Sequence, residues 1–444
     1  MSIALEDGTR VGIIGGGPAG SLFAYFLLTF AERMDLQLSV DIYEPRNFAM
    51  AGPGGCNMCG GIVSESLIQA LAVEGIELPS TIVQRGIDSY VMHTDRETIK
   101  LDTPLREKRI AAVHRGGGPR DIDVERWGGL DGFLMSRAQS LGANVIPARV
   151  ADVGWDGERP QIHAKNGAET YDLLVGATGV NSGGWDLFEK LGFVCERPTT
   201  TKAYITELKL GQQAIDEQFG TSMHMFLLNL PRLDCAAMIP KGDYVTVCLL
   251  GDDIDRDLIN EFFSTEAVRS CFPADFNAEQ GACHCSPRIN IKESSRPFLD
   301  RVVLVGDCGT TRLYKDGIGA AYRTAKAAAR TSVFSGIGAA EYEAHYWPTY
   351  RSISGDNRYG LFIFKVVHWI KALRPFLKGT LLMASSEQQN PRAAKRMSVV
   401  LWDMFTGSAP YREIFMRTLS PRFVGSLAWQ TARGAVSAGR TKGK

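Results

Sequence analysis

The stretch R-V-G-I-I-G-G-G-P-A-G, residues Arg10–Gly20, decides the fold of this chain. A short β-branched strand leads into Gly15, Gly17 and Gly20 at G-x-G-x-x-G spacing, and the helix-forming run Ser21–Phe30 follows at once. The first glycine allows a tight turn, the second lets backbone N–H groups approach a pyrophosphate, and the third lets the helix pack on the strand. The positive end of the helix then faces the phosphates. This order of elements predicts a dinucleotide-binding turn.

A second strand, Leu38–Tyr43, ends in Glu44, which stands 24 residues after the last glycine of the turn. The dinucleotide fingerprint places a carboxylate near this distance, where it binds a ribose diol. The residues that this segment predicts to contact the cofactor are Gly15, Gly17, Pro18, Ala19, Gly20 and Glu44.

Two later segments favour FAD over NAD as the dinucleotide. Arg301–Asp307 reads R-V-V-L-V-G-D, a buried-strand pattern that ends in a carboxylate and precedes another helix. Tyr171–Gly179 reads Y-D-L-L-V-G-A-T-G, a strand that runs into a turn of small residues. A carboxylate at a strand end suits a sugar-alcohol chain, and small residues let the backbone pass the cofactor closely. The cofactor-binding residues expected here are Thr178, Gly179, Gly306, Asp307, Gly317, Ile318 and Gly319.

Together these three segments resemble the FAD-binding motifs of the p-hydroxybenzoate-hydroxylase-type flavoproteins, and in particular the geranylgeranyl reductase family. The resemblance extends over most of residues 9–345. It implies an α/β fold, in which a Rossmann-like FAD-binding domain is interleaved with an antiparallel β-sheet substrate domain. It also implies that Arg115 lies near the cofactor. The chain departs from the hydroxylase pattern at Thr178, where hydroxylases carry an aspartate, and this departure counts against hydroxylation.

The loop Ala51–Ile62, A-G-P-G-G-C-N-M-C-G-G-I, contains the candidate catalytic residues. Cys59, Gly60 and Gly61 resemble the Cys-Gly-Gly element of geranylgeranyl reductases, and this resemblance places Gly60 and Gly61 at the cofactor. A thiol there is suited to protonate a substrate after hydride arrives from the flavin, or to shape the pocket. Cys56 stands at C-x-x-C spacing from Cys59 and is the second catalytic candidate.

A further cysteine pair, Cys283 and Cys285, leaves three alternatives open for the thiols. With Cys56 and Cys59 they are free thiols, a redox dithiol, or four soft ligands for zinc or an iron–sulfur cluster. Our leading expectation is that these four cysteines bind no metal, because their spacing matches no well-attested ligand pattern. The remaining cysteines are expected to be small core residues: Cys195, Cys235, Cys248, Cys271 and Cys308. We also expect His93, His114 and His284 to be ordinary sheet residues.

The cofactor segments predict a discontinuous domain organisation. Residues 1–80, 118–190 and 291–345 are assigned to the FAD-binding domain, and residues 81–117 and 200–290 to the substrate-binding sheet. Residues 346–444 are expected to form a helical, basic C-terminal region. From residue 360 onward the chain carries 14 basic and three acidic residues, although the whole chain has no net charge.

This charge asymmetry indicates an anionic partner for the C-terminal region. The segment Leu361–Met383 combines aromatic and aliphatic side chains with spaced cations, and is broken at Pro375. It reads as an amphipathic helix lying in a membrane interface, or alternatively as a helix docked on the flavin domain with a solvated basic face. Nucleic-acid binding is not expected, because no nucleic-acid module accompanies the charge.

The glycine turn begins so close to the first residue that no targeting segment is expected, and no uncharged apolar run is long enough to span a membrane. We therefore expect a cytoplasmic enzyme, peripheral to the inner face of the membrane. The predicted function is an FAD-dependent oxidoreductase that reduces carbon–carbon double bonds of an isoprenoid or other lipid, with an external electron donor. The alternatives are an FAD-dependent monooxygenase, a flavin and iron–sulfur protein that transfers electrons to quinone, and a non-catalytic flavin-binding adaptor.

Overall fold

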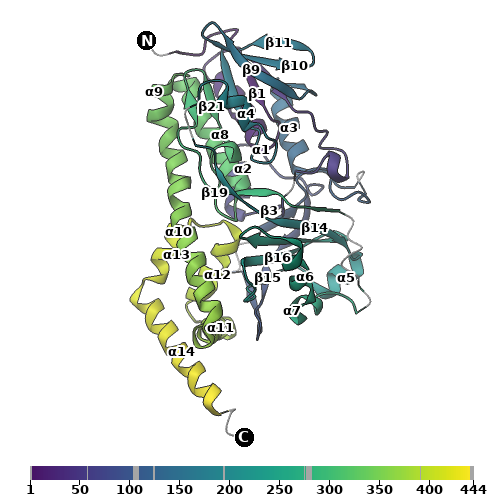
Figure 1. Ribbon diagram of the computed structural model, residues 1–444, viewed down its shortest axis with the longest axis vertical. Helices are drawn as coiled ribbons and strands as arrows, with labels where there is room; N and C mark the ends of the chain where they lie inside the picture. The colour runs from purple at the N-terminus through teal and green to yellow at the C-terminus, as the bar shows by residue number, and fades with distance from the viewer. Residues whose placement is uncertain are drawn as a thin grey trace. The chain divides into compact units, whose positions relative to one another are not determined.

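The computed structural model describes residues 3–57, 59–103, 110–123, 126–193, 196–274, 276, 283–390 and 392–440. They form two compact units, each assembled from three segments of the chain (Figure 1). The first unit consists of residues 1–57, 114–201 and 288–357, and the second of residues 58–113, 202–287 and 358–444. The predicted α/β class with parallel and antiparallel sheets and C-terminal helices is confirmed.

This division and the predicted domains differ chiefly in four segments. Residues 58–80 and 358–444 lie in the second unit, and residues 114–117 and 346–357 lie in the first. The structural division rests on compactness, whereas the predicted one rests on cofactor binding. The assignment of cofactor and substrate roles to particular segments therefore stays a prediction.

The first unit is built on a six-stranded sheet in the order β20-β21-β12-β1-β2-β8. Its centre is parallel: β1 pairs with both β2 and β12, and β12 pairs with β21. Strands buried on both faces read as apolar runs, as β1 does, because helices cover the sheet. The elements of this unit are β1 Arg10–Ile14, α1 Pro18–Glu32, β2 Ser39–Tyr43, α3 Leu130–Ser140, β8 Asn144–Ile146, β9 Val150–Asp156, β10 Arg159–Ala164, β11 Gly167–Thr170, β12 Leu173–Gly176, α4 Trp185–Glu189, β13 Thr199–Lys202, β19 Arg288–Lys292, β20 Phe298–Leu299, β21 Val302–Leu304, α8 Gly317–Phe334 and α9 Ala339–Glu341.

Helix α1 is apolar on nearly every side, and this composition matches its central position. It packs against α8 and α3, and its Phe26 ring meets the Tyr322 ring of α8 edge to face with centroids 5.5 Å apart. A helix that is hydrophobic all round has to be buried. Helices α1 and α8, which follow the Arg10–Gly20 and Arg301–Asp307 segments, are therefore fixed against each other.

The second unit contains a seven-stranded sheet in the order β18-β14-β17-β16-β15-β5-β6 and a small sheet β3-β7-β4. Strands β16 and β17 form an antiparallel hairpin around Lys241–Tyr244. The elements are β3 Ile62–Val63, α2 Glu65–Val73, β4 Val83–Ile87, β5 Ser89–His93, β6 Thr98–Asp102, β7 Ile110–Val113, β14 Tyr204–Lys209, α5 Gln212–Gln218, β15 Ser222–Phe226, β16 Leu233–Lys241, β17 Tyr244–Gly251, α6 Arg256–Ser264, α7 Glu266–Arg269, β18 Cys283–Cys285, α11 Arg374–Gln389, α12 Arg396–Thr406, α13 Tyr411–Thr418 and α14 Pro421–Arg440.

Side chains from the two faces of the large sheet meet different helices. On one face, apolar residues of β14 to β17 form a core with α5, α6 and α7, in which Phe226 packs edge to face on Phe262. On the other face, Tyr90 of β5 stacks on Trp402 of α12 with ring centroids 4.4 Å apart, and Trp402 is fully buried. The face that points away from α5 to α7 also carries Cys248 and packs against the loop that contains Cys59.

The predicted amphipathic segment forms the end of α10 (Trp347–Ala372) and the start of α11. The helices are separated at Leu373, and Pro375 lies in the first turn of α11, where a missing N–H costs nothing. Within the described part of the chain, every helix falls short of the combined length and hydropathy that crossing a bilayer requires. Of the expected core cysteines, Cys235, Cys248, Cys271 and Cys308 are buried, and Cys195 lies outside the described residues.

We predict that Gly20→Ala destabilises the protein, because a Cβ at Gly20 would lie 1.9 Å from the carbonyl oxygen of Gly15. Overpacking of this kind costs about 1–3 kcal/mol. Gly355→Ala in α10 is the matched control, since a Cβ there meets open space and alanine in a helix gains about 0.5–1 kcal/mol. Urea unfolding followed by tryptophan fluorescence measures both. Equal midpoints for Gly20→Ala and the wild type would contradict this account of the turn.

Candidate functional site: a dinucleotide turn and a thiol loop

The turn after β1 is shaped by close contacts between backbones. Gly15 has a φ of +106°, and a Cβ there would lie 2.5 Å from the carbonyl oxygen of Ala177 at the end of β12. A Cβ at Gly17, by contrast, would meet only the Asn57 amide at 3.4 Å. The absence of a side chain at Gly15 thus lets the Arg10–Gly20 turn pack against the end of the Tyr171–Gly179 segment. The backbone at Gly17 is open to a ligand.

No side chain caps the start of helix α1 at this turn. Its N-cap, Gly17, supplies no side-chain cap hydrogen bond, and the first turn contains no acidic residue. The first N–H groups of a helix need partners, and an anion is the usual one. The residues present therefore fit the pyrophosphate of a dinucleotide.

Glu44 lies at the end of β2, as predicted for the ribose-binding carboxylate. Its side chain is buried and accepts hydrogen bonds of 2.9 Å from the backbone N–H groups of Gly16 and Arg46. These two donors fix the carboxylate beside the glycine turn. A carboxylate has further lone pairs available for a diol.

A polar network of four side chains lies beside the turn. Asp131, which is fully buried, accepts hydrogen bonds from Arg115 Nε at 2.5 Å and from the Asn57 amide at 2.5 Å. Arg46 donates in turn to the Asn57 amide oxygen at 2.9 Å. The structure thus connects the predicted Arg115 to the turn. Sequence reasoning missed Asn57 and Asp131, because only the tertiary structure brings a loop and the start of α3 together.

The Arg301–Asp307 segment packs directly on the start of helix α1. A Cβ at Gly306, which has a φ of +66°, would lie 2.6 Å from the Cβ of Ala19 in α1. Burial raises the pKa of the adjacent Asp307, while a hydrogen bond with Thr311 and the positive charge of Arg115 oppose that rise. Pro18, Ala19, Gly306 and Asp307 are therefore gathered at one end of the parallel sheet, where open α/β sheets bind ligands.

Helix α8 begins at Gly317 with an N-cap, Asp316, in the left-handed conformation. The Asp316 carboxylate accepts hydrogen bonds from Arg312 at 2.8 Å and from Arg323 at 2.7 Å, and makes no cap bond to the helix backbone. A Cβ at Gly319 would collide with this carboxylate. The N–H groups at the start of α8, which include the predicted Ile318, are thus available to a partner.

Thr178 and Gly179 follow β12, as expected. Ala177 N–H bonds to the Ile14 carbonyl, so this turn lies next to the dinucleotide turn. The Thr178 hydroxyl lies 3.4 Å from the Cys308 thiol, and Gly179 has a φ of +67°. The structure therefore gathers the cofactor residues of all three segments within the first unit. Their contact with a cofactor stays a prediction.

In the second unit, the Cys59-Gly60-Gly61 loop packs on the face of the large sheet opposite to α5, α6 and α7. A Cβ at Gly60 would lie 2.9 Å from the Cys248 sulfur, and one at Gly61 would lie 2.9 Å from the Lys241 ammonium nitrogen. The Gly61 N–H donates to the Cys59 sulfur at 3.4 Å. These glycines are required because side chains would not fit between the loop and the sheet.

Beneath this loop lies a buried ion pair. Lys241 is 1% exposed, and its ammonium nitrogen is 3.6 Å from the Glu207 carboxylate, which accepts a hydrogen bond from Thr246 at 2.7 Å. Burial raises the pKa of the neighbouring Cys248, and the Lys241 charge opposes that rise. The loop therefore faces a charged group in surroundings that disfavour a thiolate at Cys248.

The four candidate cysteines are divided between the two units. Cys283 and Cys285 lie on β18, opposite Glu207 and Ile205 of β14. Among the described residues of the second unit, these two and Cys59 do not form a set of three converging metal ligands, and none of them is in a disulfide. Cys56 belongs to the first unit. The four-cysteine cluster stays a prediction.

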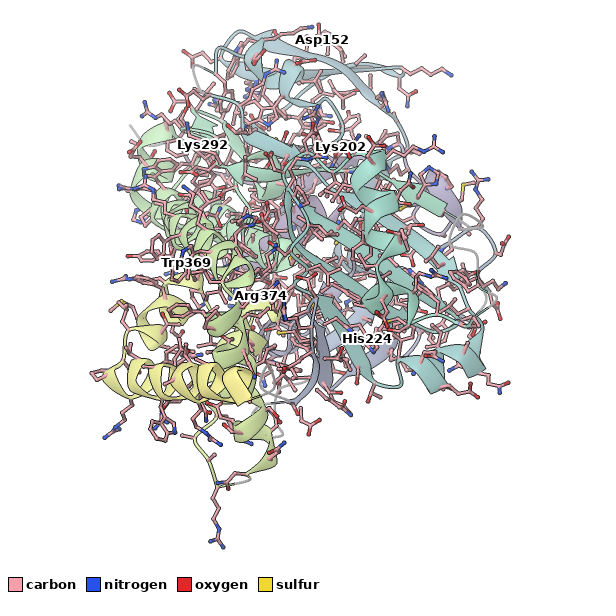
Figure 2. All side chains as sticks on the ribbon, turned by 60° about the horizontal axis from the view of Figure 1, so that its bottom comes forward. Asp152, Lys202, His224, Lys292, Trp369 and Arg374 are labelled. Atoms are coloured by element: carbon pink, nitrogen blue, oxygen red, sulfur yellow. The ribbon has the colours of Figure 1, made fainter. Side chains whose placement is uncertain are left out.

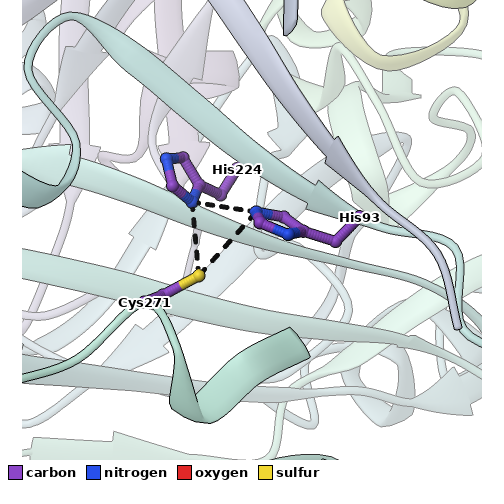
Figure 3. A group of neighbouring side chains, drawn as sticks. All are labelled: His93, His224 and Cys271. Atoms are coloured by element: carbon purple, nitrogen blue, oxygen red, sulfur yellow. Dashed lines mark hydrogen bonds between the residues drawn. The ribbon is translucent and has the colours of Figure 1, made fainter. Parts of the chain in front are cut away.

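A cluster that the sequence did not indicate lies in the core of the second unit: His93, His224 and Cys271 (Figure 3). Burial lowers the pKa of His93 to about 4. Burial and the neighbouring His93 lower the pKa of His224 to about 3. Both imidazoles are therefore neutral near pH 7. The expectation that His93 is an ordinary sheet residue and Cys271 a lone core residue missed this cluster, because no spacing along the chain links them.

No family model and no curated protein sequence matches this chain. Solved structures do match it. A geranylgeranyl bacteriochlorophyll reductase-like protein from Thermoplasma acidophilum superposes with a TM-score of 0.58 at 14% identity, covering 96% of this chain and 100% of that protein. A flavin-dependent brominase gives 0.58 at 16% identity, covering 98% and 100%. The p-nitrophenol 4-monooxygenase of Pseudomonas putida DLL-E4 gives 0.53 at 12%, covering 96% and 99%.

This chain shares the fold of these structures, which include a flavin-dependent brominase, and this agrees with the fold that the sequence motifs predicted. At such low identity the likeness defines the fold and leaves the reaction open. The glycine turn, the uncapped α1 and the fixed Glu44 fit a dinucleotide cofactor on independent grounds.

We predict that Asp131→Asn weakens both stability and flavin binding. Breaking a buried ion pair costs up to about 3–5 kcal/mol, and Asp131 also orients Asn57 beside Gly17. Asp121→Asn, in an exposed loop, is the control. Urea unfolding and the flavin absorbance retained after gel filtration measure the two effects. If Asp131→Asn matches Asp121→Asn in both, the network does not support the turn.

Proposed function

We propose that this protein is an FAD-dependent oxidoreductase that reduces carbon–carbon double bonds of an isoprenoid or other hydrophobic lipid. The proposal rests on the Cys59-Gly60-Gly61 loop, which packs a thiol onto a sheet face that carries Cys248 and Lys241. The flavoprotein fold supports it, as does the presence of a reductase-like protein among the structures that match.

The residues that would hold FAD lie in the first unit. The start of α1 would bind the pyrophosphate, Glu44 the ribose diol, and Asp307 the sugar-alcohol chain, with Arg115 supported by Asp131. The uncapped N-terminus of α8 would stabilise negative charge on the ring. Reduced FAD, when bound, supplies the hydride for the reduction.

The second half of the reduction is proton delivery, which we assign to Cys59. The hydride saturates one carbon of the double bond, and the thiol proton saturates the other, after which solvent reprotonates the sulfur. Cys56 is the second candidate donor.

The surroundings of the loop suit a hydrophobic substrate and a transient anion. The Ile239 side chain would lie 3.3 Å from a Cβ at Gly60, so the loop meets an apolar group here. Lys241 supplies a buried positive charge at Gly61, and a nearby cation favours the anion that forms when a thiol gives up its proton.

Monooxygenation is the alternative, since a monooxygenase and flavin-dependent halogenases are among the structures that share the fold. Thr178 replaces an aspartate that hydroxylases typically carry and that geranylgeranyl reductases often keep too, and its loss counts more heavily against hydroxylation. The chain has a single strand–glycine–helix fingerprint, which FAD would occupy. An external protein or other reductant is therefore the expected electron donor.

The test is an anaerobic assay with dithionite-reduced, FAD-loaded protein and a geranylgeranyl lipid, with product mass measured over time. We expect a gain of two hydrogens per double bond. Cys59→Ala should lower the rate at least tenfold, because loss of a positioned proton donor typically costs about 10²–10⁴-fold. Flavin content should stay unchanged.

Cys235→Ala removes another buried thiol of the second unit and is the control. Cys56→Ala tests whether Cys56 also donates a proton to the substrate. Substrate-stimulated oxygen consumption with addition of an oxygen atom would replace this proposal with a monooxygenase. Bound flavin that no donor turns over would favour a non-catalytic adaptor.

We further propose that the C-terminal helices bring the protein to an anionic membrane surface, where such a substrate resides. Among the described residues, eight of the fourteen exposed large hydrophobic side chains fall between Leu361 and Trp429. Trp369 of α10 lies beside Phe376 of α11, with ring centroids 5.0 Å apart, and Arg374 is exposed next to them (Figure 2). Exposed aromatic and aliphatic side chains among arginines and lysines are typical of helices that lie in a membrane interface.

We expect the protein to co-sediment with vesicles of phosphatidylcholine and phosphatidylglycerol, and much less with phosphatidylcholine alone. Added salt should weaken this binding, because surface charges are screened. Trp369→Ser combined with Trp429→Ser should weaken it at least tenfold. Trp155→Ser, at an exposed tryptophan of the first unit, is the control. Equal sedimentation of both variants with the wild type would rule out this surface.

A further inference from the structure

Three ligand atoms converge in the core of the second unit. The Nε2 atom of His93 lies 3.1 Å from Nδ1 of His224, which lies 3.4 Å from the Cys271 sulfur. The sulfur is 3.7 Å from His93 Nε2 and closes the triangle (Figure 3). All three side chains are buried.

The strand register produces this arrangement. β5 and β15 are parallel neighbours in which His93 lies opposite Phe226 and His224 opposite Val91. Residues two apart on a strand share a face, so both histidines point to the side covered by α5, α6 and α7. Cys271, two residues after α7, lies over the same face. The register and this connection, rather than local sequence, place the ligands together.

The triangle has the dimensions of a tetrahedral zinc site. With Zn–N bonds of about 2.05 Å and Zn–S bonds of about 2.3 Å, tetrahedral angles separate two nitrogens by roughly 3.3 Å and nitrogen from sulfur by roughly 3.6 Å. The three observed distances lie within a few tenths of an ångström of these values. Two imidazoles with one thiolate form a donor set that suits zinc.

The surroundings also resemble those of a metal site. His93 contacts the Thr98 hydroxyl through Nδ1 at 3.1 Å, and a partner on the far nitrogen is what orients metal-binding histidines. The Phe226 ring stacks on His93 with centroids 4.6 Å apart, and the Phe219 ring lies 4.7 Å from His224. These rings pack against the two imidazoles.

We propose that His93, His224 and Cys271 bind one zinc ion that fastens the segment after α7 to strands β5 and β15. Binding releases the thiol proton of Cys271 to solvent, and no redox change is involved. The site is independent of the proposed flavin chemistry. Among residues that the structure describes, the group contains three ligands, so water is a suitable fourth.

The test measures metal binding by the full chain, stripped with a chelator and then supplied with zinc or with cobalt as a spectroscopic probe. We expect one zinc per chain by mass spectrometry and a rise in the unfolding temperature upon zinc addition. Cobalt should give the visible bands of a tetrahedral ion and a thiolate charge-transfer band. Cys271→Ala should lose the charge-transfer band, and His224→Gln should lower zinc affinity at least a hundredfold.

Cys235→Ala and His284→Gln are the controls, because they remove another buried thiol and an exposed imidazole from the same unit. Both should bind zinc as the wild type does. Failure of the wild type to take up zinc would overturn the proposal and leave a hydrogen-bonded core cluster. Unchanged affinity and spectrum in Cys271→Ala would overturn it as well. The wild-type cobalt spectrum tests the proposed site even if a variant does not fold, because a thiolate charge-transfer band requires a cysteine ligand.

Discussion

The close approach of helix α1 to the turn after strand β1 is the constraint on which the cofactor motifs of the first unit depend. The Gly20 position lies so near the Gly15 carbonyl that no side chain fits, and Gly15 itself meets the end of β12. Gly306 abuts Ala19 in the same way. These contacts bring three motifs, distant in sequence, to one end of the sheet. Because the backbones approach closely, helix N–H groups remain available to a cofactor.

Buried charge then specifies the surroundings of the turn. Asp131 is fully buried and has a partner in Arg115, and Asp316 has partners in Arg312 and Arg323. Buried ion pairs add little net stability, because desolvation offsets their attraction, yet losing one partner is costly. Such pairs are better understood as fixing geometry than as holding the fold together. Hydrophobic packing, such as that of α1 on α8, supplies the stability.

The large sheet of the second unit has two faces with different chemistry. One carries Cys248, Lys241 and the glycine-rich thiol loop, and the opposite one carries His93, His224 and the apolar core. Since side chains alternate along a strand, a single strand serves both faces. The proposed catalytic thiol loop and the proposed zinc ligands therefore lie on opposite faces of one sheet and share no residues.

The sequence by itself determined the flavoprotein fold, the glycine turn, the position of Glu44 and the helical C-terminal region. These follow from periodicity and spacing over a few tens of residues, where local sterics dominate. Only the tertiary structure decided that Asn57 and Asp131 lie beside Arg115, and that His93, His224 and Cys271 converge. His93 lies 131 residues from His224 and 178 from Cys271. Such contacts depend on strand register and on how connections cover a sheet, and no local pattern encodes them.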